Sequence, residues 1–378
     1  MKKLVAILLC VIFVASLVAC GKDYGYDYYN YDLSEYITVG DYTNLDVTVY
    51  TKTRDREKQN VIDYYTEYYA TSDEEATVAE GNTIYATYTC TIDGVKVDAE
   101  SGENKYIKLG QGTLLTEVEA AIIGMICEKP VSVEVTFPAD YSNTDVAGKT
   151  ATFQITAHYV MVPAEYNDAF VATYFEAYGV STMAEFDAYM NRNFVLNATI
   201  EAIMASESFK VHKYPELELN AKVDEQCAYD DSTYQSYGFT LEEVLAASNM
   251  TLKDYKAQLA ASESILTALR SEMIYHHIIR AEGFEASDEE ANVLRDELIT
   301  DTLSYYKSMY EAYGITGSTL DSYLANVLAS LKETYTTEQC KLNILYDLVE
   351  ELLATSQNVN YVDDFDPAES ENNTTDAE

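Results

Sequence analysis

Hydrophobic and polar residues alternate along several short runs between Gly81 and Val160, which is the pattern of half-buried β-strands. We predict strands at residues 83–92, 105–109, 131–137 and 150–160. Asp93-Gly94 ends the first of them, as a tight turn between strands commonly does. A short amphipathic helix at residues 117–123 stops at Gly124. Together these elements predict a curved antiparallel sheet wrapped around one short helix.

From residue 163 to residue 354 the hydrophobic positions follow the spacing of helices, so we predict an all-helical domain there. Several of these helices begin with a Ser or Thr that is followed three residues later by an acidic residue, which caps the first turn. The predicted starts are at Thr182, Thr240, Thr251, Ser287 and Ser318. Their spacing is irregular, which indicates helix-turn-helix connections rather than a solenoid repeat.

Three further segments flank these two regions. Residues 36–78 predict a lead-in that consists of a strand pair over Tyr36–Tyr50 and then a helix from Thr53 to Tyr69. Residues 21–35 are rich in Tyr and Asp and predict a flexible tether. Residues 355–378 are acidic and have few apolar side chains, so we expect a disordered tail.

The first twenty residues have the organisation of a bacterial export signal, with Lys2-Lys3 before the apolar run Leu4–Val18. That run is too short for a confident membrane-spanning helix. The sequence LVACG around Cys20 resembles the lipobox of bacterial lipoproteins. By this resemblance residues 1–20 are a lipoprotein signal peptide, Cys20 is lipidated, and the lipid anchors the protein to the extracytoplasmic face of the cell membrane. An ordinary secretory signal with an incidental Cys is the alternative.

The charge of the chain limits the classes of molecule that the protein can bind. The formal net charge is −40 and the pI is about 4.2, so the protein repels phosphates and anionic headgroups and we exclude nucleic-acid binding. Hydrophobic residues make up 48% of the 378 residues, enough for two or three domains with their own cores. The chain has 35 Tyr and no Trp. Tyrosine suits adaptable contact surfaces, although a compositional habit explains its abundance equally well.

The motifs between residues 81 and 160 resemble the FKBP family of peptidyl-prolyl isomerases, in the form carried by trigger factor. They are, in order, GNTIYATYT, DGVKVD, LGQGTLLTEVEAAIIGM, VTFPADY and AGKTATFQIT. The segment KYPELELNAKVDEQ and the helical patterns after it resemble the helical C-terminal domain of trigger factor.

This resemblance implies an α+β protein. An FKBP-like domain at residues 79–162 is inserted into, or precedes, a larger all-α domain at residues 163–354. In that family the strand-helix lead-in belongs to the helical domain. The ribosome-binding domain of the family is missing from this sequence, and a signal peptide stands in its place.

Prolyl isomerisation needs no acid, base or metal, because its barrier is the amide resonance of roughly 18–20 kcal/mol. A catalyst lowers that barrier by holding the twisted amide in an apolar, aromatic pocket with one or two hydrogen bonds. By the resemblance, Leu115 offers its backbone N–H to a substrate carbonyl. The implied catalytic residues are Tyr88, Asp98, Leu115 and Tyr141, and the implied pocket residues are Val97, Tyr106, Leu114, Val118 and Ile155.

Several positions depart from the family pattern. Val97 stands in place of Phe, Val118 in place of the Trp or Phe of the pocket floor, and Ile155 where Phe is common; Glu117 replaces a usual Gly. The lost aromatic area weakens the pocket, and we expect Tyr106 to replace part of it. The alternative is a module kept for peptide binding or as a spacer, with weak or no turnover.

No other residue pattern predicts catalysis. His276 and His277 are adjacent on a predicted helix and point to different faces, so they make poor metal ligands. The cysteines at 90, 127, 227 and 340 are far apart and form no CxxC motif, which argues against zinc and thioredoxin chemistry. We expect Cys90 and Cys127 to be buried thiols. We therefore predict neither a metal nor a cofactor.

Together these features predict a membrane-anchored, extracytoplasmic folding factor. Its expected partners are unfolded or nascent exported polypeptides with X-Pro bonds and, through the lipid, the membrane, but neither nucleic acid nor the ribosome. Uncatalysed X-Pro isomerisation takes tens to hundreds of seconds. A non-catalytic chaperone or peptide-binding lipoprotein with a degenerate pocket is the main alternative. A third alternative, a surface adhesin or scaffold, lacks any visible β-sandwich or carbohydrate-site motif.

Overall fold

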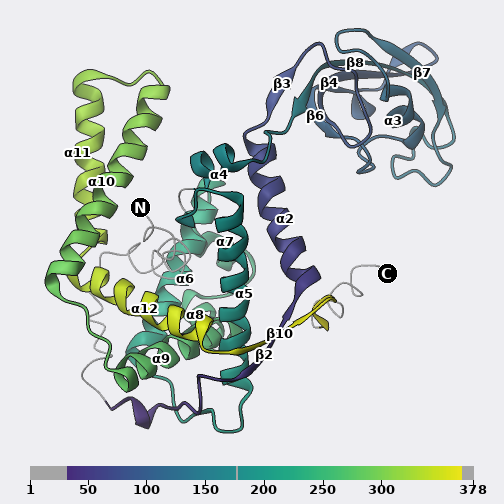
Figure 1. Ribbon diagram of the computed structural model, residues 1–378. Coiled ribbons are helices and arrows are strands. Elements are labelled where there is room, and N and C mark those ends of the chain that lie inside the picture. Colours follow the sequence, from purple (N-terminus) through teal and green to yellow (C-terminus); the bar gives the residue numbers. More distant parts are fainter. Residues whose placement is uncertain (1–31, 176–177, 368–378) are drawn as a thin grey trace. The chain divides into compact units, whose positions relative to one another are not determined.

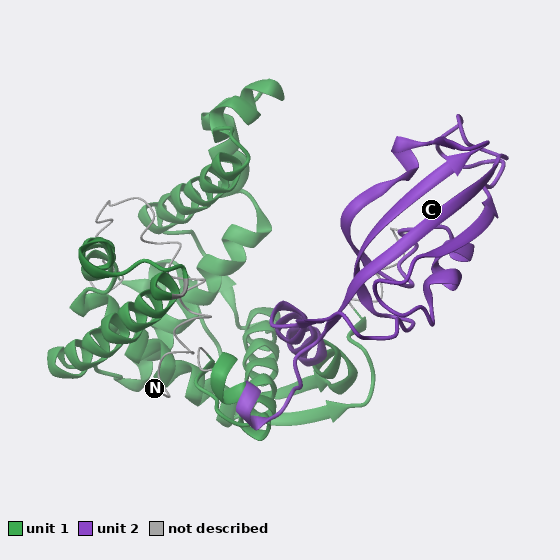
Figure 2. Cartoon of the chain, turned by 90° about the horizontal axis from the view of Figure 1, so that it is seen from above, with its two compact units in different colours: residues 1–56, 171–378 green, residues 57–170 purple. Residues whose placement is uncertain are grey.

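The computed structural model describes residues 32–175 and 178–367, and the chain divides into two compact units (Figure 2). The inserted unit comprises residues 57–170, and the helical unit comprises the chain before and after it, residues 1–56 and 171–378. The predicted signal peptide with Cys20, most of the predicted tether and the end of the predicted tail lie outside the described residues. The α+β class predicted from the sequence is confirmed.

A six-stranded antiparallel sheet forms the inserted unit (Figure 1). The strand β4 pairs with β5, β6 and β8, and β8 pairs in addition with β3 and β7. The four predicted strands are confirmed, although the second begins earlier than predicted, at Gly102. The strands are β3 (Thr71–Asp73), β4 (Thr83–Ile92), β5 (Val95–Lys96), β6 (Gly102–Lys108), β7 (Val131–Thr136) and β8 (Thr150–Val162).

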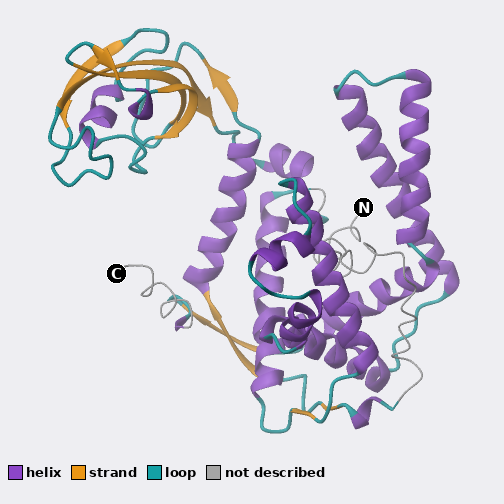
Figure 3. Ribbon diagram, turned by 180° about the vertical axis from the view of Figure 1, so that it is seen from behind, coloured by secondary structure: helices purple, strands orange, loops and turns teal. Residues whose placement is uncertain are grey.

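The sheet curves around the short helix α3 (Thr116–Ile122), as predicted (Figure 3). Alternate residues of β4 and β8 face this helix, since Ile84, Ala86, Ile155 and Ala157 are all fully buried. Val118 of α3 is buried in the same core. The alternation of the sequence therefore reflects one buried and one solvated face of the sheet.

The chain enters and leaves the sheet of the inserted unit through neighbouring strands. β3 pairs with the end of β8, so that Thr71 lies opposite Val162 and Asp73 opposite Val160. We call these paired segments, residues 71–73 and 160–162, the neck. The predicted boundary at residue 79 lies inside the fold, because Val78 is 1% exposed and exchanges backbone hydrogen bonds with Gly124 and Met125.

The helical unit is formed by long helices on either side of the insertion in the sequence. The predicted helix at 53–69 is confirmed as α2, which begins in the helical unit and ends in the inserted unit. The helices are α2 (Thr51–Tyr68), α4 (Asp168–Tyr174), α5 (Met183–Ala205), α6 (Glu216–Ser236), α7 (Leu241–Ala247), α8 (Leu252–Ala260), α9 (Glu263–Glu282), α10 (Asp288–Ala312), α11 (Gly317–Thr334) and α12 (Thr337–Thr355), with a 3-10 turn, η2, at Leu33–Glu35.

Four of the five predicted helix starts are confirmed. Thr182, Thr240, Thr251 and Ser287 each accept a hydrogen bond from the backbone N–H three residues later. The predicted start at Ser318 is wrong. There α11 begins at Gly317, and its N-cap makes no side-chain capping bond.

The main core of the helical unit lies between α5, α9 and α12. Leu269, Met273 and Ile278 of α9 pack with Val349 and Leu353 of α12, and all five are fully buried. A second cluster joins α6, α7 and α9. Leu269 and Met273 of α9 are four residues apart, as are Val349 and Leu353 of α12, which is the spacing that places each pair on one helix face.

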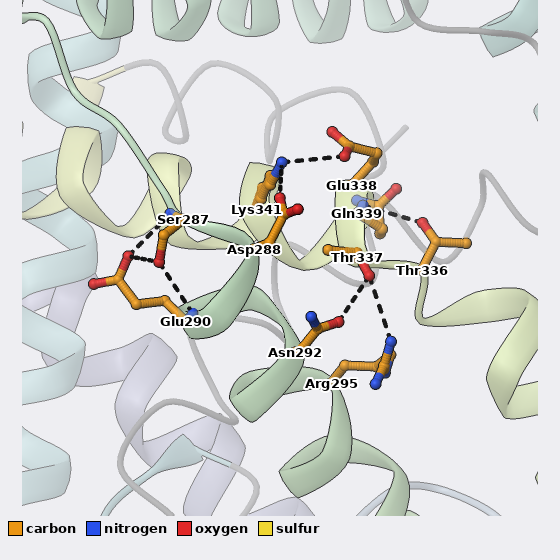
Figure 4. Close-up of polar contacts among 10 residues, drawn as sticks. All are labelled: Ser287, Asp288, Glu290, Asn292, Arg295, Thr336, Thr337, Glu338, Gln339 and Lys341. Atoms are coloured by element: carbon orange, nitrogen blue, oxygen red, sulfur yellow. Dashed lines mark hydrogen bonds and ion pairs between the residues drawn. The ribbon is translucent and has the colours of Figure 1, made fainter.

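The helices α10 and α11 form an antiparallel hairpin whose base is tied to α12 (Figure 1). Figure 4 shows the polar part of this junction, in which Lys341 of α12 pairs with Asp288 at the start of α10 and, at 3.2 Å, with Glu338. The Thr337 hydroxyl donates to the Asn292 amide oxygen at 2.8 Å. Apolar contacts among Leu294, Leu298 and Cys340 complete the base.

The short strands of the helical unit correct two predictions. β1 (Ile37–Thr38) and β2 (Asp46–Tyr50) do not pair with each other, because each pairs with a later segment of the chain. β1 pairs with β9 (Lys210–Val211), and β2 pairs in parallel with β10 (Asn358–Val362). Residues 358–362 are therefore a strand and not part of a disordered tail. Sequence pattern alone missed it because its partner lies some 300 residues earlier.

Within residues 32–175 and 178–367, none of the helices combines the length and the hydropathy that a bilayer crossing needs.

Candidate functional site

The ring of Tyr88 is held against the backbone of a neighbouring strand. Tyr88 lies on the buried face of β4 and pairs with Gly102 of β6. A Cβ atom at Gly102 would lie 2.6 Å from Cε1 and 2.8 Å from the hydroxyl of Tyr88. The absent side chain is therefore what allows the ring to lie across β6. Among the described residues none makes a hydrogen bond to the Tyr88 hydroxyl, which leaves it available to a ligand.

Tyr141 approaches the same surface from the loop after β7. Its ring packs on Phe137 with centroids 4.8 Å apart, and its hydroxyl donates to Glu100 Oε2 at 3.1 Å. Asn143 donates to the other oxygen of the same carboxylate at 2.8 Å. Glu100 therefore fixes the position of Tyr141 from the opposite side of the site.

The loop that carries Glu100 is tied to β4. Glu100 ends a short 3-10 turn, η3 (Asp98–Glu100), and Ser101 follows it. The Ser101 hydroxyl accepts the Cys90 N–H at 3.0 Å and donates to the Val97 carbonyl at 2.7 Å. The Val97 N–H in turn donates to the Cys90 carbonyl at 2.9 Å. These bonds hold Val97 and Glu100 in place relative to Tyr88.

A buried carboxylate shapes the loop on the other side of the site. Glu119 of α3 is 9% exposed and accepts the N–H of Gly110 at 2.9 Å and that of Leu114 at 3.3 Å. Leu115 then serves as the N-cap residue of α3. No described residue accepts a hydrogen bond from the Leu115 N–H. A free donor beside apolar side chains is what the predicted role of Leu115 requires.

Burial and the Glu100 charge act together on the tyrosines. Burial raises the pKa of Tyr88, and the negative charge of Glu100 raises it further. Burial also raises the pKa of Tyr141, and so does its hydrogen bond to Glu100. Burial followed by the Glu100 charge raises the pKa of Cys90 to about 11. Both phenols therefore stay neutral and keep their protons for donation over the physiological range.

Most of the predicted pocket residues come together around this surface. Val118 and Ile155 are fully buried in the core beneath this surface, which we call its floor, and neither side chain is exposed. The half-buried residues that pack against this core include Tyr88, Val97, Leu114, Leu115 and Tyr141. The floor is thus aliphatic, as the departures at Val118 and Ile155 predict.

Two predicted residues lie elsewhere. Tyr106 is 61% exposed and packs on Tyr85, with centroids 4.9 Å apart, on the outer face of the sheet. The prediction that it replaces lost pocket area is wrong, because Tyr106 is next to the buried Ile107 and so lies on the opposite face of β6. Asp98 also points outward, since its side chain is 87% exposed and pairs with Lys96 at 3.1 Å. The carboxylate at the site is that of Glu100.

Three residues that shape the site are not predicted by the sequence pattern: Glu100, Gly102 and Glu119. Glu100 follows Asp98 by only two residues, and the 3-10 turn between them decides which of the two faces the site. Gly102 carried a usable signal, because a glycine inside a strand often marks a close approach of another group. Glu119 had none, since a buried carboxylate on an amphipathic helix resembles a solvated one in sequence.

His276 and the cysteines among the described residues are buried in the cores of the two units. His276 is 2% exposed, and burial followed by the charge of Arg280 lowers its pKa to about 3. Cys90, Cys127, Cys227 and Cys340 are buried free thiols, as predicted for the first two. In the part of the chain that the structure describes, no group of three or more His, Cys, Asp or Glu side chains could hold a metal ion.

A curved sheet around one helix, with tyrosines and a free N–H at an apolar surface, is the arrangement of an FKBP-type domain. Residues 74–158 match the family model of the FKBP-type peptidyl-prolyl cis-trans isomerase. The chain therefore carries an FKBP-type domain within its inserted unit.

Similarity to known proteins extends well beyond that domain. The chain is 28% identical over 293 residues to the trigger factor of Streptococcus mutans, which covers 72% of this chain and 65% of that protein. It is 26% identical over 306 residues to the trigger factor of Agathobacter rectalis, with 77% and 65% covered. A match to the trigger factor of Streptococcus suis reaches 30% identity over 234 residues and covers 58% and 53%.

The chain is therefore homologous to trigger factors over most of its length, and it spans just under two thirds of the relatives named first. A solved structure of the trigger factor chaperone covers 84% of this chain at 16% identity with a TM-score of 0.27. That score is too low for a comparison of whole molecules to add to the sequence relationship.

Proposed function

We propose that this protein is a folding factor that isomerises X-Pro bonds at the surface around Tyr88 and Tyr141 and holds unfolded polypeptides on its helical unit. The observation that carries the proposal is the convergence of these two tyrosines and the free Leu115 N–H on one apolar surface of an FKBP-type domain. Homology to trigger factors over both units supports the combination of the two activities.

The chemistry follows from how amide resonance is weakened. The prolyl ring packs against the half-buried apolar side chains of Val97 and Leu114, which keep water from the amide as it twists. The Leu115 N–H donates to a substrate carbonyl, and the rings of Tyr88 and Tyr141 enclose the twisted bond. Each contact is stronger with the twisted amide than with the planar one, which is what lowers the barrier.

The isomerase part is tested with a short X-Pro peptide in a protease-coupled assay. We expect catalysis by the wild type and a loss of at least about tenfold in kcat/KM in Tyr88→Ala, since an enclosing ring is removed. Tyr106→Ala is the matched control, because it removes an equal ring from the outer face of the same sheet, and its rate should equal that of the wild type. A wild-type rate no higher than background would refute the isomerase claim.

The holding part rests on exposed aromatic surface along the α10–α11 hairpin. Tyr305, Tyr313 and Tyr323 are 65%, 78% and 43% exposed. The inner rings continue this surface, since Tyr310 lies 6.0 Å from Tyr306 and 5.3 Å from Tyr323 between centroids. Tyrosine offers apolar area and a polar tip, so such a surface contacts many sequences without becoming insoluble.

Suppression of aggregation of an unfolded secreted protein tests this surface. The triple variant Tyr305→Ser, Tyr313→Ser, Tyr323→Ser should lose most of the protection. The pair Tyr64→Ser, Tyr68→Ser on α2, at 64% and 70% exposed, removes comparable area elsewhere and should retain it. Equal protection by both variants would contradict the assignment.

A non-catalytic chaperone is the second candidate, and the aliphatic floor at Val118 and Ile155 favours it. This candidate expects full protection from aggregation with no turnover of any X-Pro peptide. The two assays above therefore separate it from the first.

We infer further that the protein acts on exported polypeptides while anchored by lipid to the extracytoplasmic face of the membrane. The support is the lipobox-like sequence at Cys20, which lies outside the described residues. Radiolabelled palmitate should be incorporated by the full chain and not by Cys20→Ser, which should also leave the membrane fraction. Labelling of Cys20→Ser would contradict the proposal.

A further inference from the structure

Glu100 places a negative charge at the edge of the candidate site. Tyr141 donates to Oε2 and Asn143 donates to Oε1, so each carboxylate oxygen has one protein partner. A carboxylate has about four lone-pair positions. Since the side chain is only partly buried, the remaining positions are open to a further donor.

In the part of the chain that the structure describes, no cationic side chain neutralises this charge. Lys96, on the strand before Val97, pairs instead with Asp98 at 3.1 Å and with Glu103 at 4.0 Å. Among the described residues, no Lys, Arg or His forms an ion pair with Glu100. A half-buried carboxylate without a counter-charge attracts any cation that can approach it.

The charge acts where a substrate would lie. Glu100 is bonded to one of the two site tyrosines and is close enough to the other to raise its pKa. Tyr88 and Tyr141 are themselves close enough to interact electrostatically. A residue next to the proline of a peptide bound between these tyrosines would therefore lie near the Glu100 carboxylate.

We propose that Glu100 determines sequence preference, so that the site favours X-Pro segments with Lys or Arg beside the proline and disfavours those with Asp or Glu. This proposal rests on the proposed isomerase function of the same site. Glu100 acts as a specificity-determining residue through its charge and as a positioning residue for Tyr141 through its hydrogen bond. An acidic chain with this residue selects basic segments of its unfolded clients.

The experiment compares peptides that differ only beside the proline, as Lys-Pro, Gln-Pro and Glu-Pro, in a protease-free isomerisation assay. Two unit charges about 6 Å apart in the dielectric of water change a rate by about threefold. We expect kcat/KM for Lys-Pro to exceed that for Glu-Pro by roughly tenfold at low salt. The ratio should fall towards one at about 0.5 M salt, because exposed charges are then screened.

Variants separate the charge from general damage to the site. Glu100→Gln keeps the size and an acceptor for Asn143, and it should bring the Lys-Pro to Glu-Pro ratio close to one. Glu100→Lys should reverse the ratio. Glu134→Gln, an exposed residue on β7, changes the net charge of the unit equally and should leave the wild-type ratio unchanged. The proposal would be overturned if Glu134→Gln abolished the Lys-Pro to Glu-Pro ratio. It would also be overturned if the ratio persisted in Glu100→Gln.

A binding measurement distinguishes failure of this proposal from failure of the isomerase function. The same peptides are titrated into the full chain, and binding is followed by NMR shifts of the inserted unit. If no peptide is isomerised but Lys-Pro still binds more tightly than Glu-Pro in a Glu100-dependent manner, the preference stands and only turnover is lost. Equal binding of all three peptides to the wild type overturns the preference.

Discussion

The position of the Tyr88 ring depends on the absence of a side chain at Gly102. The ring lies across the backbone of β6, where its hydroxyl would be 2.8 Å from any Cβ atom added to Gly102. Gly102 is buried, so the ring cannot avoid the new atom by turning into solvent. The functional position of one residue is therefore set by the smallness of another.

We predict that Gly102→Ala lowers the free energy of unfolding of the inserted unit by about 1–3 kcal/mol, as overpacking commonly does. It should also lower kcat/KM for X-Pro peptides, because the displaced ring no longer faces Tyr141. Urea unfolding and the peptide assay measure the two effects.

A double-mutant cycle checks the cause. In the background Tyr88→Ala the clash is absent, so Gly102→Ala should cost much less stability there than in the wild type. Additive costs would show that the glycine matters for another reason.

The burial of His276 makes the stability of the helical unit depend on pH, and the direction of this dependence follows from its lowered pKa. Its imidazole is buried beside Tyr346, whose hydroxyl lies 3.1 Å from Nε2, and burial lowers its pKa to about 3. The imidazole of His276 therefore binds a proton near pH 6.5 in the unfolded chain, but only near pH 3 in the folded chain. The resulting stability is fully present above pH 6.5 and is lost as the pH falls towards 3.

We predict that the free energy of unfolding of the helical unit falls by about 1.4 kcal/mol per pH unit from this group below pH 6.5. In His276→Gln that part of the slope should disappear, as measured by urea unfolding at pH 7.0 and 5.5 with helical circular dichroism. His212→Gln, at an exposed histidine, should retain the wild-type slope. An unchanged slope in His276→Gln would contradict the interpretation.

At the scale of elements, local signals in the sequence predicted local structure well. The capping residues Thr182 and Ser287 and the alternation of β4 and β8 depend on neighbours within a few residues. The pairing of β2 with β10 depends on segments far apart in the chain, and a five-residue strand followed by acidic residues resembles a tail. The side chain that faces the site, Glu100 rather than Asp98, depends on one 3-10 turn.

The strand β10 makes a clear prediction about truncation. Ending the chain after Gln357 removes the partner of β2, whose Val47 and Val49 are buried in the helical unit. Backbone groups of Asp46–Tyr50 then lose their hydrogen bonds, each worth about 0.5–1.5 kcal/mol net. We expect the helical unit to lose about 2–5 kcal/mol of unfolding free energy, measured by urea unfolding.

The matched control is a chain that ends after Pro367. It removes residues 368–378 and keeps all of β10, so its stability should equal that of the full chain. Equal stability of both truncations would mean that β10 contributes nothing.

At the scale of the whole molecule, the neck explains how one unit can interrupt another. Residues 71–73 lie beside residues 160–162, so the strand by which the chain leaves the sheet lies next to the strand by which it enters. The core of this unit, from Val78 to Val160, contains no residue of the helical unit. Each unit thus has what it needs to fold by itself.

We predict that a fragment of residues 71–162 folds cooperatively and retains the peptide activity of the full chain. A fragment of residues 79–162 should be less stable by about 2–4 kcal/mol, because it lacks the buried Val78 and the strand β3. Thermal unfolding of both fragments measures the difference. Equal stability would place the boundary at 79 after all.

Because the core of the inserted unit contains no residue of the helical unit, substitutions within this core need no matching substitutions in the core of the helical unit. Substitutions could replace the aromatic residues of the site or add a charge such as Glu100. A deletion could remove residues 71–162. In each case the packing of the helices in the helical unit could stay the same. The aliphatic residues beneath Tyr88 are substitutions of the kind that two separate cores allow. The inserted unit and the helical unit can therefore evolve at different rates.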